Sequence, residues 1–134
     1  MTTEEKVKHW VKLSDYDLET ALVMLNTGRY LYVGFMCHQV IEKIFKAAYE
    51  HQINDTPPFV HDLILLVNRA GFLEMLDDKQ MSFIEQLSPL NIRARYPDYK
   101  QELAKELTKT VCENLIIKTQ ELQQWTKEKI LLIK

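Results

Sequence analysis

Residues 33–48 carry apolar side chains at the spacing of an α-helix, and this segment constrains the fold more than any other part of the chain. The apolar residues fall on one side of the helix and form a stripe that other elements must cover. The segment therefore predicts a buried helix around which the rest of the chain packs. The members of the stripe are Val33, Cys37, Val40, Ile41, Ile44, Phe45 and Ala48.

Polar side chains follow another side of the same helix. Gln39, Glu42 and Lys46 lie about one turn apart, and His38 and Lys43 flank them. Glu42 precedes Lys46 by four residues, the order that favours an ion pair on a helix. Two interpretations remain open: a solvated face with one ion pair, or a covered face whose polar groups need hydrogen-bond partners.

The segment before this helix is predicted to be a second long helix, paired with it. Thr2 and Glu5 form a capping-box pattern at its start, and Gly28 suits the left-handed position after its end. The connection is short, so the next helix, from Arg29 or Tyr30 to His51, must run antiparallel. The inward side of the first helix is expected to carry Val7, Trp10, Val11, Ser14, Leu18, Ala21, Leu22 and Leu25.

Shorter elements are expected after the helical hairpin. Residues 54–58 include two prolines, which interrupt a helix because proline has no amide hydrogen to donate. A short helix is predicted over about residues 60–70, before Gly71. Another, capped by Asp77 or Asp78, is predicted to run through Met81, Ile84 and Leu87 and to end at Ser88-Pro89.

Residues 88–100 show no periodicity and are expected to form an irregular segment that contains two arginines and two tyrosines. A short helical turn is expected over residues 99–107. A last long helix is predicted to start at Thr108 or Thr110 and to end near Ile133.

Composition supports the helical prediction. Only three glycines and four prolines occur in 134 residues, too few for a protein rich in tight β-turns. We therefore predict an all-α fold: one domain over residues 1–134, an up-and-down bundle of three long and about two short helices.

Charge and cysteine use exclude several classes of function. The net charge of −2 argues against a protein that coats duplex nucleic acid. Cys37 and Cys112 lie among apolar neighbours, which favours buried free thiols over a disulfide. No metal-ligand spacing occurs, so we expect neither a metal nor a cofactor. The chain starts without an apolar leader and has no membrane-length apolar run, so we expect a soluble cytoplasmic protein.

Four fragments, in order along the chain, resemble the HEPN domain family over nearly its whole length. They are Trp10…Asp17-Leu18…Ala21…Leu25…Gly28-Arg29-Tyr30, then Phe35…Gln39…Glu42-Lys43…Lys46, then His61-Asp62-Leu63, and last Ala94-Arg95-Tyr96-Pro97-Asp98. The resemblance implies a homodimeric helical bundle and a nucleotide or RNA ligand. It also implies a minimal nucleotidyltransferase as partner, in a pair of the toxin–antitoxin type.

Many members of this family are metal-independent ribonucleases that carry an arginine followed, about four to six residues later, by a histidine. The resemblance implies phosphate binding by that arginine and acid–base chemistry on the 2′-hydroxyl by that histidine. Here Arg93, Arg95 and Arg69 have no such histidine, and no histidine follows His61. The chain is similar to the Arg-Tyr-Pro subgroup instead. A binding module is therefore favoured, with a divergent ribonuclease using His61 and Arg93 or Arg95, or a scaffold subunit, as the alternatives.

The candidate ligand-binding residues each have a second, structural interpretation. Arg93 and Arg95 offer paired hydrogen bonds to a phosphate, but Arg95 is equally suited to an ion pair with Glu42. Tyr96 and Tyr99 either stack on a base or simply pack.

The histidine at the start of the third helix and the polar helix face are also candidates. His61 either contacts a phosphate or acts as a base, or it caps the helix or bonds a loop; Asp62 is favoured as the cap. The remaining candidates, Gln39, Glu42, Lys43 and Lys46, form either the wall of a cleft opposite the arginine segment or a set of hydrogen bonds that fixes a loop or a dimer partner.

Overall fold

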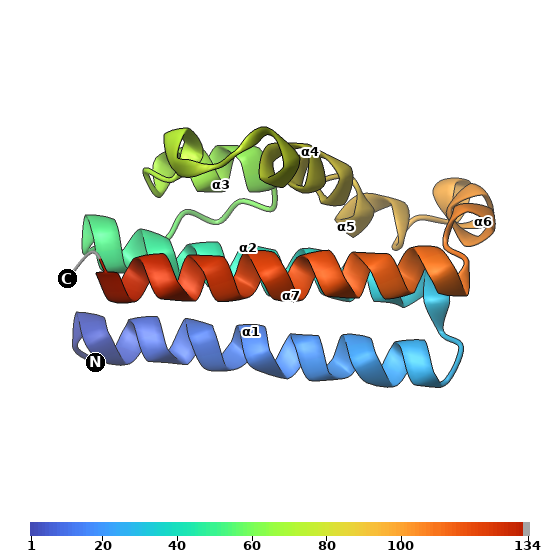
Figure 1. Cartoon of the computed structure of the whole chain (residues 1–134), viewed down its shortest axis with the longest axis horizontal. Helices are drawn as coiled ribbons and strands as arrows, with labels where there is room; N and C mark the ends of the chain where they lie inside the picture. Colours follow the sequence, from blue (N-terminus) through green and yellow to red (C-terminus); the bar gives the residue numbers. More distant parts are fainter. Residues whose placement is uncertain (133–134) are drawn as a thin grey trace.

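Three helices of 24 residues each run side by side through the whole length of the molecule, and a layer of shorter helices covers one side of them (Figure 1). The computed structural model describes residues 1–132, with side chains through residue 130. The long helices are α1 (Thr3–Asn26), α2 (Tyr30–Ile53) and α7 (Lys109–Leu132). The shorter elements are α3 (Leu63–Arg69), the 3-10 helix η1 (Leu73–Met75), α4 (Asp78–Leu87), α5 (Leu90–Arg93) and α6 (Pro97–Glu106).

The all-α prediction is confirmed, and the order of the helices is that of an up-and-down bundle. Helix α2 runs back along α1, the segment α3–α6 returns toward the other end, and α7 runs back parallel to α2 (Figure 1). The return leg is broken into short pieces, so there are more short helices than the two expected. No helix within residues 1–132 is both long and apolar enough to cross a lipid bilayer.

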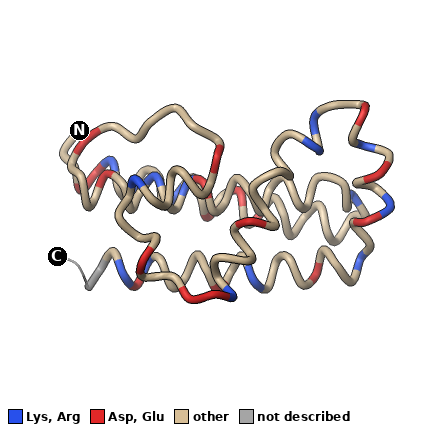
Figure 2. Tube along the Cα trace, turned by 90° about the horizontal axis from the view of Figure 1, so that it is seen from above, with Lys and Arg blue, Asp and Glu red and all other residues tan. Residues whose placement is uncertain are grey.

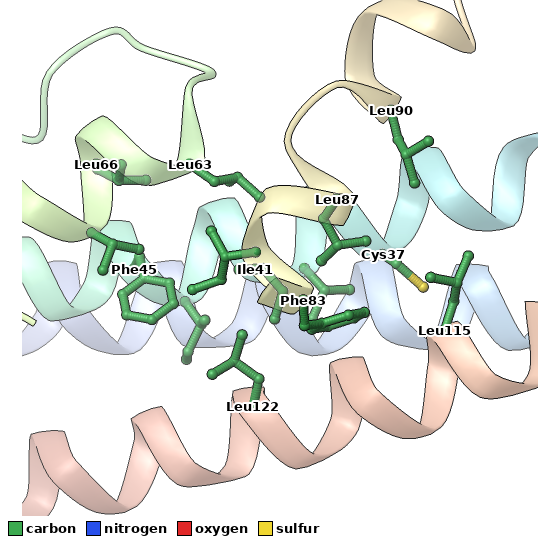
Figure 3. Packing of buried hydrophobic residues seen from close by; sticks show 14 of the residues in the cluster. Cys37, Ile41, Phe45, Leu63, Leu66, Phe83, Leu87, Leu90, Leu115 and Leu122 are labelled. Atoms are coloured by element: carbon green, nitrogen blue, oxygen red, sulfur yellow. The ribbon is translucent and has the colours of Figure 1, made fainter. Parts of the chain in front are cut away.

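Helix α2 is the centre of the molecule, as its apolar stripe predicted. It contacts every other α-helix of the described chain. Figure 3 shows Ile41 and Phe45 of α2 between Leu63 and Leu66 of α3 on one side and Leu122 of α7 on the other. Burial of such side chains is worth roughly 1.5–3 kcal/mol each, so this contact layer is the main source of stability.

The ends of the first two helices follow the local sequence. The Thr2 hydroxyl accepts a hydrogen bond from the Glu5 amide at 3.1 Å, which satisfies one free donor at the start of α1. Gly28 takes a left-handed conformation with φ of +76°, which an L side chain adopts only with strain. The turn places Tyr30 at the start of α2, within the predicted boundary.

Two boundaries can be compared directly with the sequence prediction. Helix α3 starts at Leu63 and not at Val60, because Asp62 is its N-cap and accepts from the amides of Ile64 and Leu65 at 3.0 and 3.1 Å. Helix α4 has the expected start, with Asp77 as cap.

Residues 88–100 are not irregular, contrary to the prediction. They contain α5 and the start of α6, whose first residue is Pro97, a residue that suits the first helical position because no amide hydrogen is needed there. Thr108 accepts from the Val111 amide and begins α7, while the predicted end near Ile133 lies outside the described residues.

Candidate functional site

Four polar residues one turn apart form a buried row on α2. His38, Glu42, Lys46 and Glu50 are 0%, 3%, 9% and 3% exposed. We call these four residues the polar ladder. A buried charge is costly unless it is paired and hydrogen-bonded, so each member needs a partner. The alternative of a solvated helix face is therefore wrong for Glu42 and Lys46.

Glu42 is the hub of the polar ladder. Its Oε1 atom accepts a hydrogen bond from His61 Nδ1 at 2.9 Å, and its Oε2 atom accepts from Lys46 Nζ at 3.1 Å. The predicted Glu42–Lys46 ion pair is confirmed. The alternative in which Arg95 pairs with Glu42 is wrong, because His61 and Lys46 bond the two carboxylate oxygens and Arg95 bonds the Asn91 carbonyl instead.

His38 contacts the same cluster from inside the core. Its Nε2 lies 3.1 Å from the His61 carbonyl oxygen, and its Nδ1 lies 3.3 Å from Gln39 Oε1 and 3.9 Å from Glu42 Oε1. Burial of the imidazole lowers the pKa of His38 from its ordinary value of 6.5, although the Glu42 carboxylate opposes the shift. A neutral, structural imidazole follows from this environment.

His61 combines a fixed position with access to solvent. Its side chain is 57% exposed, although Nδ1 is bonded to Glu42 and the backbone carbonyl is bonded to His38. His61 is not the cap of α3, because Asp62 has that role, as expected. A half-exposed imidazole oriented by a buried carboxylate is able to accept or donate a proton at its second nitrogen.

Helix α1 closes the other end of the polar ladder. Trp10 Nε1 donates to Glu50 Oε2 at 2.9 Å, and Lys46 Nζ lies 5.3 Å from the centre of the Trp10 ring. Lys43, which was expected on the same polar face as Glu42, turns toward α1 and donates to Asp17. The polar face therefore fixes neighbouring elements of the same chain.

Arg93, one of the two candidate phosphate ligands, already binds a carboxylate. Its two terminal nitrogens donate to the two oxygens of Glu106 at 2.9 and 3.1 Å, which joins α5 to the end of α6. This hydrogen bonding raises the pKa of Arg93 and lowers the pKa of Glu106. Arg93 can bind a ligand only by giving up or sharing Glu106.

Arg95 has more of its hydrogen-bonding capacity available. Its Nε donates to the Asn91 carbonyl oxygen at 2.9 Å, and it forms no ion pair within the described part of the chain. Tyr96 and Tyr99, on the same stretch, are 52% and 46% exposed. We call the stretch 92–100 the α5–α6 corner. It presents a guanidinium and two aromatic rings to solvent.

The structure does not bring His61 and the two arginines to one site. The α5–α6 corner joins the bundle beside Gly34, where a Cβ atom would lie 3.0 Å from a methyl carbon of Leu90. Glu42, which holds His61, is eight residues further along α2, roughly 12 Å at 1.5 Å per residue. Within the described residues, no hydrogen bond or ion pair joins His61 to Arg93 or Arg95, which bond Glu106 and the Asn91 carbonyl instead.

The charges around the α5–α6 corner are mixed in sign. Figure 2 shows Lys and Arg alternating with Asp and Glu over α6, with no continuous basic stripe. Lys100 itself donates to the Tyr32 hydroxyl at 3.5 Å. Such a surface suits a small or single-stranded anion better than a long duplex.

In the described residues, neither the two cysteines nor the acidic side chains form a metal site. Cys37 and Cys112 are free and buried, as predicted, and burial raises their pKa values to about 12 and about 11. Within residues 1–132, no cluster of three or more histidine, cysteine, aspartate or glutamate side chains is arranged to hold a metal ion.

Sequence reasoning missed three members of the polar cluster. The sequence places His38 only beside the polar residues of the helix, does not single out Glu50, and places Trp10 on the apolar side of the first helix. The repeat of polar residues every four positions from His38 to Glu50 was the available signal. It was weak because the same spacing occurs on any exposed helix face.

Comparison with known proteins gives two matches. A family model, the HEPN domain, matches residues 7–130. The crystal structure of TT1696 from Thermus thermophilus superposes with a TM-score of 0.78, over 92% of this chain and 98% of that chain. The two sequences are 19% identical, a level at which the likeness shows a shared fold only. No curated protein matched the sequence.

Proposed function

Since this chain belongs to the HEPN domain family, we propose that it is a binding module for a nucleotide or a short RNA segment, contacted at the α5–α6 corner. It acts as a homodimer and works beside a minimal nucleotidyltransferase, as a toxin–antitoxin-type pair. The observation that carries the proposal is the state of Arg95: it is exposed, it has no acidic partner in the described chain, and it stands next to Tyr96 and Tyr99.

The roles of the residues follow from their chemistry. The terminal nitrogens of Arg95 form two parallel hydrogen bonds to phosphate oxygens. Tyr96 and Tyr99 stack on bases, a contact that is sequence-tolerant because every base has an aromatic face. Arg93 contributes charge while it holds the corner together through Glu106.

The remaining candidates support this surface from a distance. Gln39, Glu42 and Lys46 hold the α2–α3 connection through His38 and His61, and Lys43 holds α1. They are proposed as structural supports and not as ligand contacts, because their polar groups already have partners within the protein.

Calorimetry tests the proposal directly. ATP, GTP and short single-stranded RNAs are titrated into the protein, and at least one of them is expected to bind. Arg95→Ala should weaken that binding about tenfold or more, the loss expected when a charged bidentate contact disappears. Arg69→Ala, which removes an exposed arginine at the end of α3, is the matched control and should change affinity little.

Two results would rule out the proposed binding site. One is the absence of binding by every ligand tested. The other is an equal loss of affinity in Arg69→Ala and Arg95→Ala, which would indicate attraction by net charge and not a site.

A divergent ribonuclease is the second candidate, and one observation favours it. His61 is 57% exposed and is oriented by the buried Glu42 carboxylate, the arrangement of a general base. In this scheme His61 takes the proton from a 2′-hydroxyl, whose oxygen attacks the phosphorus while the 5′-oxygen leaves. An arginine of a second copy binds the phosphate, since neither candidate arginine of its own chain contacts His61. His61→Ala should then lose cleavage of a pooled RNA substrate; cleavage equal to that of the parent protein rules this mechanism out.

A further inference from the structure

The hydrogen bonds that hold the connection between α2 and α3 against α2 come from one residue. Residues 54–62 form no helix; Pro57 is buried and Val60 packs against the core, and His61 makes two hydrogen bonds to α2. The His61 side chain bonds Glu42, and the His61 carbonyl bonds His38. Loss of these hydrogen bonds loosens the segment that leads into α3, whose cap Asp62 is the next residue, while Leu63 stays in the core.

We propose that His38, Glu42, Lys46 and His61 form a proton-controlled latch that fastens the α2–α3 connection to α2 while His38 is neutral and releases it when His38 takes up a proton. The latch needs no ligand, so it goes beyond the proposed binding function and does not depend on it.

The hydrogen positions in the closed latch follow from its partners. A carbonyl oxygen only accepts, so the Nε2 atom of His38 must carry the hydrogen that bonds the His61 carbonyl. The Glu42 carboxylate also only accepts, so the Nδ1 atom of His61 carries the hydrogen of that bond. Neutral His38 therefore has an unprotonated Nδ1, which accepts from the Gln39 amide group when that amide is turned to present its nitrogen, and which lies 3.9 Å from Glu42 Oε1.

A proton added to Nδ1 of His38 disturbs this arrangement in two ways. It creates a second donor directed at Glu42 Oε1, 3.9 Å away, in competition with His61 for the same oxygen. It also places a positive charge on a side chain that is 0% exposed, and water can reach this charge only if the covering connection moves. Both effects favour the open state.

The charged groups around the latch come from several elements. Glu42 on α2 and His61 on the connection act on His38 directly, and they oppose one another. Lys46 lies on the other oxygen of Glu42. The remaining groups nearby are already engaged: Asp62 caps α3, Asp17 of α1 bonds Lys43, and Glu50 bonds Trp10 of α1.

The sign of the pH dependence follows from burial. The pKa of His38 is lower in the folded protein than its ordinary value of 6.5, so the closed latch is fully stable above that value. Stability is lost as pH falls below about 6.5 toward the folded pKa, because the open state binds the proton more tightly. Each pH unit in that window multiplies the open population by up to about tenfold.

Hydrogen exchange of backbone amides tests the latch at the place where it acts. Protection of the α3 amides, corrected for the intrinsic exchange rate, should fall about tenfold between about pH 7 and pH 5, while that of α7 stays constant. His38→Gln retains a donor for the His61 carbonyl and cannot titrate. In this variant, α3 protection should change by less than about twofold over the same range.

His61→Gln is the matched control, because glutamine still donates to Glu42 and removes titration at that position. The acid-induced loss of α3 protection should persist in it. A loss that persists in His38→Gln, or that disappears in His61→Gln, overturns the latch, because the proton would then act elsewhere.

A second measurement keeps the idea testable if His38→Gln does not fold. Nuclear magnetic resonance titration of the parent protein gives the pH at which the His38 ring takes up its proton. The loss of α3 protection should begin near pH 6.5 and level off below the midpoint of that titration. A loss that follows the curve of His61 or of a carboxylate instead overturns the proposal.

Discussion

Glu42 and Lys46 in the polar ladder keep 4% and 11% of their side-chain surface exposed. Arg93 in the α5–α6 corner keeps 25%, and its partner Glu106 at the end of α6 keeps 57%. The contacts are of similar length, 3.1 Å in the first pair and 2.9 and 3.1 Å in the second. The two pairs differ in burial and not in distance. Breaking the buried pair is therefore expected to destabilise the fold more than breaking the exposed pair.

The difference also explains why binding is proposed at the corner and not at the ladder. Charges of the ladder have partners on α1, α2 and the α2–α3 connection, so a ligand would have to displace protein groups. At the corner, Arg95 is satisfied by one backbone carbonyl and remains open to an added anion.

The largest effect is expected at the hub of the ladder. Glu42→Leu leaves the Lys46 ammonium buried without a carboxylate and removes the partner of His61, so the protein should lose about 3 kcal/mol of stability in urea unfolding. The double variant Glu42→Leu with Lys46→Met should recover most of the loss, because no unpaired charge remains. A loss below about 1 kcal/mol in the single variant would mean that the ladder behaves like the solvated corner.

The next effect concerns the α1 end of the ladder. Trp10→Phe keeps most of the ring packing but removes the donor to Glu50, which is 3% exposed, and should cost about 1–2 kcal/mol in thermal unfolding. A double-mutant cycle with Glu50→Gln isolates the hydrogen bond. Additive effects of the two changes would show that the contact contributes nothing.

The ion pair at the corner should contribute less. Arg93→Ala is expected to cost at most about 1 kcal/mol, since solvent screens the pair. The pKa of Glu106 is lowered by Arg93, so the contribution is present above the ordinary value of 4.5 and lost as pH falls through the folded pKa. The free energies of unfolding of the parent protein and of Arg93→Ala, measured in parallel against pH, should therefore converge in acid. A difference that stays constant with pH would contradict an origin in the ion pair with Glu106.

The smallest effect on stability is expected for Arg95→Ala, within about 0.5 kcal/mol, because the residue is exposed and bonds only a carbonyl four residues earlier. Chemical unfolding reports the effect of Arg95→Ala on stability, and calorimetry reports its effect on ligand binding, so the two effects can be told apart. A large destabilisation would show that Arg95 is a structural residue of the corner, and the contrast between the corner and the ladder would fail.

Local patterns allowed much of the fold to be predicted. The Thr2 cap, the glycine after α1 and the stripe around Ile41 depend on residues within a few positions of each other, so their geometry follows from the chain itself. The start of α6 was missed although Pro97 signals a first helical position, because the surrounding residues have no apolar period.

The candidate site was predicted less well. The ion pair of Glu42 with Lys46 was foreseen because it lies within one helix, but the contact of Glu42 with His61 joins residues 19 positions apart. The alternative that paired Glu42 with Arg95 was wrong for the same reason: several basic side chains were available, and their distances from Glu42 depend on how α3 and α5 pack on α2.

The sequence by itself determined that this chain is helical, that α2 is its buried centre and that its motifs are those of the HEPN domain family. Only the tertiary structure decided which polar residues are covered and that the His61 side chain reaches Glu42. Periodicity records which side of a helix is apolar, but burial of a polar group is decided by the segment that packs over it, and that segment comes from elsewhere in the chain.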